Sequence, residues 1–137
     1  MAISDEQRHR MIRHAVLHHP SAVVDGSVVL WEKLHGVLSA IIGEGGFGSL
    51  YARNVHQTQA DFDWLTYQPP QPVSASLAQL RLDLDAQPPD LAGAASAALL
   101  VNFINTLTLL IGELLTTSIL REAWGDDVVI NAGTELE

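Results

Sequence analysis

The stretch from Leu91 to Gly112 contains no charged residue, and it constrains the fold more than any other part of the chain. Its helical apolar spacing continues to Trp124, which predicts a single helix about 50 Å long at 1.5 Å per residue. Asp90 is a favourable N-cap residue for this helix, and Gly125 stands where a C-terminal glycine cap belongs. The rest of the molecule must therefore cover a long apolar helix.

A charge-free run of this length is also long enough to span a membrane. Two features favour a buried helix instead. The flanking residues, Asp90 and Glu113, are acidic, and no Lys or Arg that could anchor the helix at a membrane surface lies between Asp90 and Arg121. Six polar residues of the helix share one face: Asn102, Asn105, Thr106, Glu113, Thr116 and Thr117. We expect a core helix, or one that lines a homodimer interface, because a small domain cannot cover so long a helix alone.

The first half of the chain also shows helical spacing. A capping-box pattern at Ser4 begins a helix that ends near His18–His19, where Pro20 follows. A second helix follows residues 25–27, and helical spacing resumes over residues 47–55. The second helix has a broad apolar stripe suited to burial on one side. Its members are Leu30, Trp31, Leu34, Val37, Leu38, Ile41 and Ile42.

Two proline-rich breaks, residues 68–72 and 87–89, bound a short helix over residues 77–84. The whole chain is therefore predicted to form an all-α, single-domain bundle of about five helices. We expect the tail, residues 126–137, to be partly extended at residues 128–130, and its last two residues match a tag-derived end.

Composition excludes several classes of function. The 137 residues include no cysteine, which rules out disulfides, thiolate catalysis and cysteine-based metal sites. Seven Lys and Arg against sixteen Asp and Glu give a net charge of −9, which argues against a nucleic-acid-binding surface. The N-terminal residues are polar and lack the apolar core of a secretory signal, so we expect a cytoplasmic protein.

A short motif recurs 69 residues apart, as Ile42-Gly43-Glu44 and Ile111-Gly112-Glu113. Such self-similarity can mark a duplicated unit. Because glycine costs a helix about 1 kcal/mol relative to alanine, we expect both glycines at a close helix crossing. The two glutamates would then lie beside these crossings, where a buried carboxylate needs a partner or a proton.

The nearest candidate cations are Arg53 and Arg121, which stand in comparable places after the two motifs. We therefore predict the crossed ion pairs Glu44–Arg121 and Glu113–Arg53. The alternative is that each glutamate faces solvent.

Residues 43–48 satisfy the pattern G-x-G-x-x-G. The segment from Ile42 to Tyr51 resembles the glycine-rich loop of protein kinases, but no lysine follows it and the chain is too short for a kinase domain. The same pattern binds dinucleotides when it follows a strand, whereas residues 28–42 have helical spacing. A bend between helices explains these glycines better than either alternative.

The helical spacing Glu-x-x-His occurs at Glu6–His9 and at Glu32–His35, as in the di-iron sites of helical bundles. Glu44 and Glu113 would complete the ligand set, but Glu44 lies only twelve residues after Glu32 and so does not come from a separate helix. The first helix also concentrates basic residues, which make either a solvated face or a docking surface for an acidic partner. They are Arg8, Arg10 and Arg13, with His9, His14, His18 and His19.

The sequence contains no nucleophile elbow or P-loop, so we expect a non-enzymatic regulatory or protein-interaction module of bacterial signalling. The first alternative is a small-ligand sensor with a polar pocket in the bundle core. Its candidate ligand-binding residues are Asn102, Asn105, Glu113, Glu44, Arg53, Arg121, Tyr51 and Trp31. The second alternative is a metal-dependent helical-bundle enzyme that uses Glu44, Glu113, His35 and His56. The expected partners are a second copy, another protein or a small molecule, and we assign no cofactor.

Overall fold

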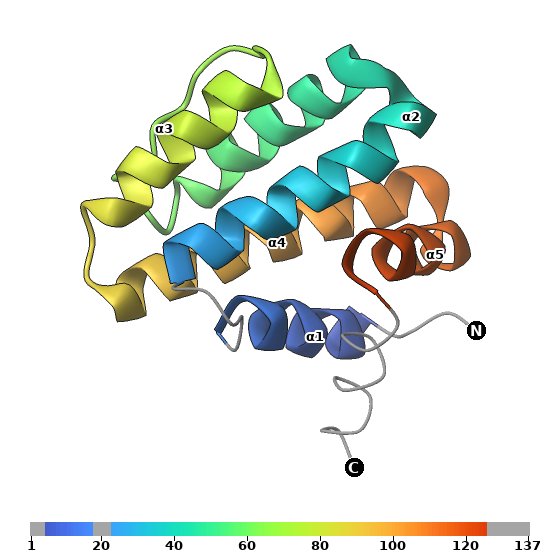
Figure 1. Ribbon diagram of the computed structural model, residues 1–137, viewed down its shortest axis with the longest axis horizontal. Coiled ribbons are helices and arrows are strands. Elements are labelled where there is room, and N and C mark those ends of the chain that lie inside the picture. Colours follow the sequence, from blue (N-terminus) through green and yellow to red (C-terminus); the bar gives the residue numbers. More distant parts are fainter. Residues whose placement is uncertain (1–4, 18–22, 126–137) are drawn as a thin grey trace.

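The computed structural model describes residues 5–17 and 23–125, which contain five helices and no strand. The helices are α1 (Asp5–Leu17), α2 (Val23–Thr58), α3 (Val73–Asp85), α4 (Pro89–Ile111) and α5 (Glu113–Trp124). The predicted all-α bundle of about five helices is therefore confirmed. The first part of α2 and α4 lie side by side, with α3 on one side of this pair and α1 on the other (Figure 1).

Some helix ends differ from the predicted ones. Pro88 and not Asp90 is the N-cap of α4, because the helix already begins at Pro89. Gly125 caps α5 as predicted, and its N–H donates to the carbonyl oxygen of Arg121 at 2.8 Å. The predicted capping residue Ser4, the helix end at His18–His19 and the whole tail, residues 126–137, lie outside the described residues.

Gly112 divides the predicted long helix over residues 91–124 into α4 and α5. Its φ of 88° and ψ of 163° lie in a region that is essentially restricted to glycine. Gly43 interrupts α2 in the same way, with φ 82° and ψ 162°. The prediction of one continuous helix is therefore wrong. Apolar residues keep their helical spacing on both sides of Gly112, so this spacing does not reveal the break.

These two glycines are required by their backbone conformation and not by a close helix contact. A Cβ atom added at Gly43 or at Gly112 would meet no atom within 4 Å. The expectation that helices nearly touch at these positions is therefore wrong.

The recurring motif nevertheless marks a structural repeat with an offset of 69 residues. Every buried residue of α2 before Gly43 has a buried counterpart 69 positions later in α4. Beyond the glycines, Leu50 and Tyr51 correspond to the buried residues Ile119 and Leu120 of α5. The equivalence of the two motifs is confirmed. Each half of the chain consists of an outer helix, α1 or α3, followed by a helix–glycine–helix unit.

The two halves interlock, because the outer helix of each packs on the central helix of the other. Helix α1 packs mainly on α4, and α3 packs on α2. The indole N–H of Trp124 in α5 donates to the carbonyl oxygen of Leu30 in α2 at 2.9 Å. One hydrophobic cluster draws residues from all five helices.

Helix α4 is long and apolar enough to cross a membrane, yet it supplies the centre of the core. Leu99, Leu100 and Phe103 are fully buried, and 44% of its most apolar window lies inside the structure. The core helix of a soluble protein passes the same test of length and composition. Exposed apolar side chains gather instead around the turn at Gly112. These elbow leucines are Leu109 (88% exposed), Leu110 (68%), Leu114 (70%) and Leu115 (43%).

Candidate functional site

Helices α1 and α4 run antiparallel and enclose a groove, which we call the α1–α4 groove. His9 Nε2 lies 3.1 Å from Asn105 Oδ1 near one end, and Leu17 lies against Gly93 near the other. The volume of the groove is about 750 Å³. Small-molecule sites typically measure roughly 300–1,000 Å³. The lining residues are His9, Arg13, Leu17, Asp61, Asp90, Gly93, Ala94, Ala97, Ala98, Val101, Asn102 and Asn105.

Small residues on one face of α4 leave room for this groove. Gly93, Ala94, Ala97 and Ala98 follow the three- and four-residue spacing of a helix face. A Cβ atom added at Gly93 would lie 3.0 Å from Leu17 Cδ2, so the glycine permits the close approach of α1. The short side chains beside this contact leave the surface hollow.

Three charged side chains line the groove: Arg13, Asp61 and Asp90. None of the three forms an ion pair or a side-chain hydrogen bond within residues 5–17 and 23–125. All three are exposed. The groove therefore offers both positive and negative charge that no described protein group neutralises by direct contact.

A buried polar network connects the groove to α2. Asn102 Nδ2 donates to Thr58 Oγ1 at 2.8 Å, and Thr58 Oγ1 donates to the carbonyl oxygen of Asn54 at 2.7 Å. Thr106 Oγ1 lies 3.1 Å from Asn54 Oδ1. Because Asn54 and Thr58 are buried, the predicted polar stripe of α4 serves in part to satisfy polar groups of α2.

Of the eight residues predicted to bind a ligand, Asn102 and Asn105 line the α1–α4 groove. Glu44 and Glu113 do not, and their side chains are 55% and 53% exposed. The prediction of a buried acid pair is therefore wrong. Each glutamate directly follows a glycine turn at the surface, where water solvates its carboxylate.

The crossed ion pairs with Arg53 and Arg121 are also wrong. Glu44 Oε2 lies 2.6 Å from His35 Nε2, and Glu113 Oε1 lies 3.9 Å from Nη1 of Arg8. The hydrogen bond from His35 lowers the pKa of Glu44 below its usual value and outweighs the desolvation that raises it.

The other predicted residues are dispersed over the molecule. Arg53 lines a separate pocket of about 390 Å³ together with His56. Arg121 is exposed on α5. Trp31 is fully buried in the core, and its ring meets that of Tyr51 edge-on with centroids 5.0 Å apart.

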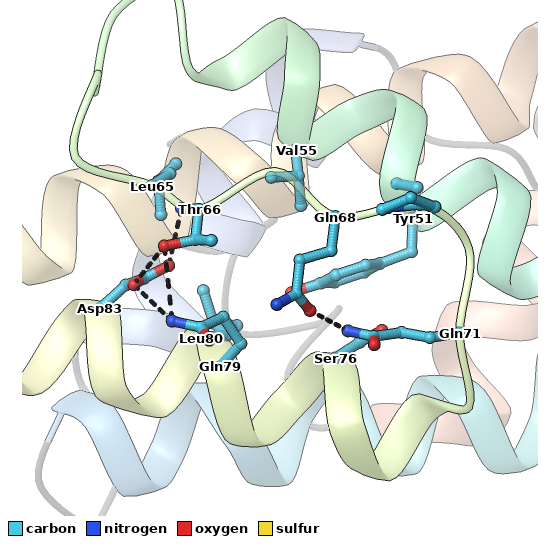
Figure 2. A pocket seen from close by; sticks show the side chains of 12 residues that line it. Tyr51, Val55, Leu65, Thr66, Gln68, Gln71, Ser76, Gln79, Leu80 and Asp83 are labelled. Carbon is cyan, nitrogen blue, oxygen red and sulfur yellow. Dashed lines mark hydrogen bonds between the residues drawn. The ribbon is translucent and has the colours of Figure 1, made fainter.

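Tyr51 lines a small cavity between α2, α3 and the connection that precedes α3 (Figure 2). Asp83 is held at one end by Thr66, whose backbone N–H and hydroxyl donate to Oδ2 at 2.8 Å and Oδ1 at 2.9 Å. Gln79 Nε2 also donates to Asp83 Oδ1, at 3.0 Å. The free volume of about 20 Å³ is enough for about one water molecule, so this cavity is too small for a larger ligand.

The pKa of the Tyr51 hydroxyl group is strongly raised in this cavity. Burial raises its pKa well above the usual value, and the charge of Asp83 raises the pKa further. Tyr51 therefore belongs to this small cavity and not to the α1–α4 groove.

The four residues of the predicted metal-dependent enzyme do not form one site. His35 contacts Glu44, whereas Glu113 pairs with Arg8 and His56 lines the pocket of Arg53. In the part of the chain that the structure describes, no three His, Asp or Glu side chains come together to hold a metal ion.

Sequence reasoning missed Asp61 and Asp90 as groove residues. It considered Arg13 only as part of a basic helix, and His9 as part of that helix or of a metal-ligand pattern with Glu6. Arg8 on the same helix is only 1% exposed, so α1 is not simply a solvated basic face. The basic character of α1 was the available signal. The sequence does not reveal that α1 packs on α4, and this packing is what places His9 and Arg13 in the groove.

Comparison of the chain with protein-family models, curated proteins and solved structures gives no match. The interpretation of the groove therefore depends on its geometry and its charges.

Proposed function

We propose that this protein is a non-enzymatic regulatory module of the bacterial cytoplasm that binds a small ligand in the α1–α4 groove. The observation that carries this proposal is a hollow of about 750 Å³ lined by Arg13, Asp61 and Asp90, none of which has a side-chain partner among residues 5–17 and 23–125. A concave apolar surface with a few polar groups is typical of sites that orient small ligands. The amide side chains of Asn102 and Asn105 add hydrogen-bonding capacity to the same surface.

Ligand binding would regulate the position of α1. Because α1 contacts the bundle mainly through α4, a ligand that touches both helices favours the docked form of α1. The docked helix belongs to one half of the chain and its docking site to the other. A change at the groove therefore alters the contact between the halves.

A thermal-denaturation screen with amino acids, peptides, nucleotides and sugars tests this proposal. A ligand that binds only the folded state stabilises it by about 2.7 kcal/mol at one hundred times its Kd. We expect at least one class to raise the melting temperature of the wild type. Ala98→Trp, which fills the groove, should abolish this shift.

The matched control is Ala78→Trp, which places the same side chain in the corresponding groove between α2 and α3. We expect this variant to keep the ligand-induced shift. The proposal fails if no compound stabilises the wild type, or if Ala98→Trp responds as the wild type does.

A second candidate function, association with another copy of the chain, is favoured by the elbow leucines. Four exposed leucines surround one turn, and exposed apolar patches mark interaction sites on soluble proteins. An unbroken helix over residues 91–124 would favour a homodimer because a small domain cannot cover it. Gly112 breaks that helix, so the exposed leucines alone favour association.

Light scattering tests this second function. We expect the wild type to have twice the mass of the 14.8 kDa chain. Leu110→Glu combined with Leu114→Glu should give a monomer with unchanged helical circular dichroism. Leu82→Glu, at an exposed leucine of α3, is the control and should remain dimeric. A monomeric wild type would exclude association through the elbow leucines.

A further inference from the structure

The repeat provides an internal comparison for the α1–α4 groove. Its counterpart in the other half is the groove between α2 and α3, with a volume of about 400 Å³. In each groove the outer helix contributes one arginine to the lining, Arg13 from α1 and Arg81 from α3. The two arginines differ in what neutralises them.

Arg81 has a carboxylate partner within the protein. Its Nη1 atom donates to Oδ1 of Asp25, in the first turn of α2. The residue 69 positions after Asp25 is Ala94, which lines the α1–α4 groove. Arg13 has no ion-pair partner in the described chain. In one half, a methyl group thus replaces the carboxylate that neutralises the arginine of the other half.

We propose that Arg13 binds the carboxylate of a zwitterionic, peptide-like ligand, at the place that Asp25 takes in the other half. This inference rests on the proposed function of the α1–α4 groove. A guanidinium group forms paired hydrogen bonds with a carboxylate, and these bonds are stronger than neutral ones. No acid pairs with Arg13 among residues 5–17 and 23–125, so its guanidinium is available for such a bond.

The acidic residues of the groove call for a positive charge on the same ligand. Asp61 and Asp90 line the groove with no side-chain partner in the described part of the chain, and both would repel a ligand that carries only negative charge. An ammonium group on the ligand removes this repulsion and pairs with one of the carboxylates. The amides of Asn102 and Asn105 match the donors and acceptors of peptide groups.

The spacing of the charges sets the length of the ligand. Leu17 is level with Gly93 along the two antiparallel helices. Arg13 lies four residues before Leu17 on α1, and Asp90 lies three residues before Gly93 on α4, so the two charges lie on opposite sides of this level. At 1.5 Å per residue, the levels of Arg13 and Asp90 are about 10 Å apart. An extended peptide of about three residues spans this distance. The termini of a tripeptide would therefore reach both charges.

Isothermal titration calorimetry of the full chain with trialanine tests the inference. We expect trialanine to bind, and its N-acetylated and C-amidated forms to bind about tenfold more weakly or worse, because each lacks one charge. Arg13→Gln and Ala94→Asp should weaken trialanine binding by a similar factor. Ala94→Asp supplies an internal partner for Arg13, as Asp25 does for Arg81. Arg81→Gln is the matched control and should bind as the wild type does.

Positions 13 and 94 are exposed, so these variants should keep the helical circular dichroism of the wild type. The inference is overturned if C-amidated trialanine binds as tightly as trialanine, or if Arg13→Gln has no effect. It is also overturned if trialanine does not bind. In that case, a different compound whose binding is lost in Ala98→Trp but kept in Arg13→Gln would leave the proposed function standing. If no compound binds the groove, both fail.

Discussion

The hydroxyl oxygens of Ser27 and Ser96 lie 2.6 Å apart, and the two residues occupy the same position in the two halves of the chain. Both side chains are fully buried. Ser96 donates to Ser27, which in turn donates to the carbonyl oxygen of Val23 at 2.6 Å. Helices α2 and α4 therefore contact each other through equivalent positions of the two halves.

Replacing either serine of this pair by alanine should lower the free energy of unfolding by about 1 kcal/mol, the usual value of one buried hydrogen bond. The double variant should lose about as much as either single variant, because both changes remove the same bond. Chemical denaturation of the four proteins measures this coupling. Strictly additive losses would show that the serines do not interact.

Alanine at Gly43 or Gly112 should destabilise the protein by about 1–3 kcal/mol, because both glycines adopt a conformation that side chains disfavour. Gly45 provides the control. It is helical, and an added Cβ would meet nothing within 4 Å. Gly45→Ala should therefore stabilise the helix by about 0.5–1 kcal/mol. Thermal and chemical denaturation measure these values, and a neutral Gly112→Ala would contradict the role given to this turn.

Tyr51 should ionise only at a pH well above its ordinary value of 10.0, because burial and the nearby Asp83 raise its pKa in the folded state. A raised pKa stabilises the folded state below pH 10 and loses this contribution as the pH rises further. Stability should therefore fall more steeply above pH 10 in the wild type than in Tyr51→Phe. At neutral pH the two proteins should differ by less than about 1 kcal/mol. Tyrosinate absorbance checks the titration, and an ordinary midpoint for Tyr51 would contradict it.

Glu44 should titrate below its ordinary value of 4.5, because the hydrogen bond from His35 stabilises its carboxylate. A lowered pKa adds stability above pH 4.5, and that stability is lost as the pH falls through the folded-state value. His35→Phe keeps an aromatic ring against Phe47 but removes the donor, so the midpoint should rise toward 4.5. Carboxylate chemical shifts measured by NMR follow this titration directly. An unchanged midpoint in the variant would assign the shift to another group.

The repeat could be predicted from the sequence, but its physical meaning could not. The motif around Gly43 and Gly112 identified two equivalent positions, whereas their φ angles depend on how the chain turns after each helix. Apolar spacing runs through Gly112 without a break, so periodicity predicted one helix. The same error predicted that Glu44 and Glu113 are buried, because two helices were expected to cross where the chain in fact turns at the surface.

The groove was only partly predictable. Asn102 and Asn105 stood out because polar residues are rare in an apolar helix. Arg13 did not stand out from Arg8 and Arg10, because the three differ in their neighbours across helices and not in their local sequence. The packing of α1 on the opposite half makes Arg13 a groove residue and buries Arg8.

The interlocking of the halves has a consequence for the connection between Thr58 and Val73. Proteolytic cleavage there would produce two peptides, and the outer helix of each would still pack on the central helix of the other. We expect the cleaved protein to persist as a non-covalent heterodimer, because the main helix contacts, including those of α1 with α4 and of α3 with α2, join the two peptides. Either peptide alone would lack the helix against which its outer helix folds.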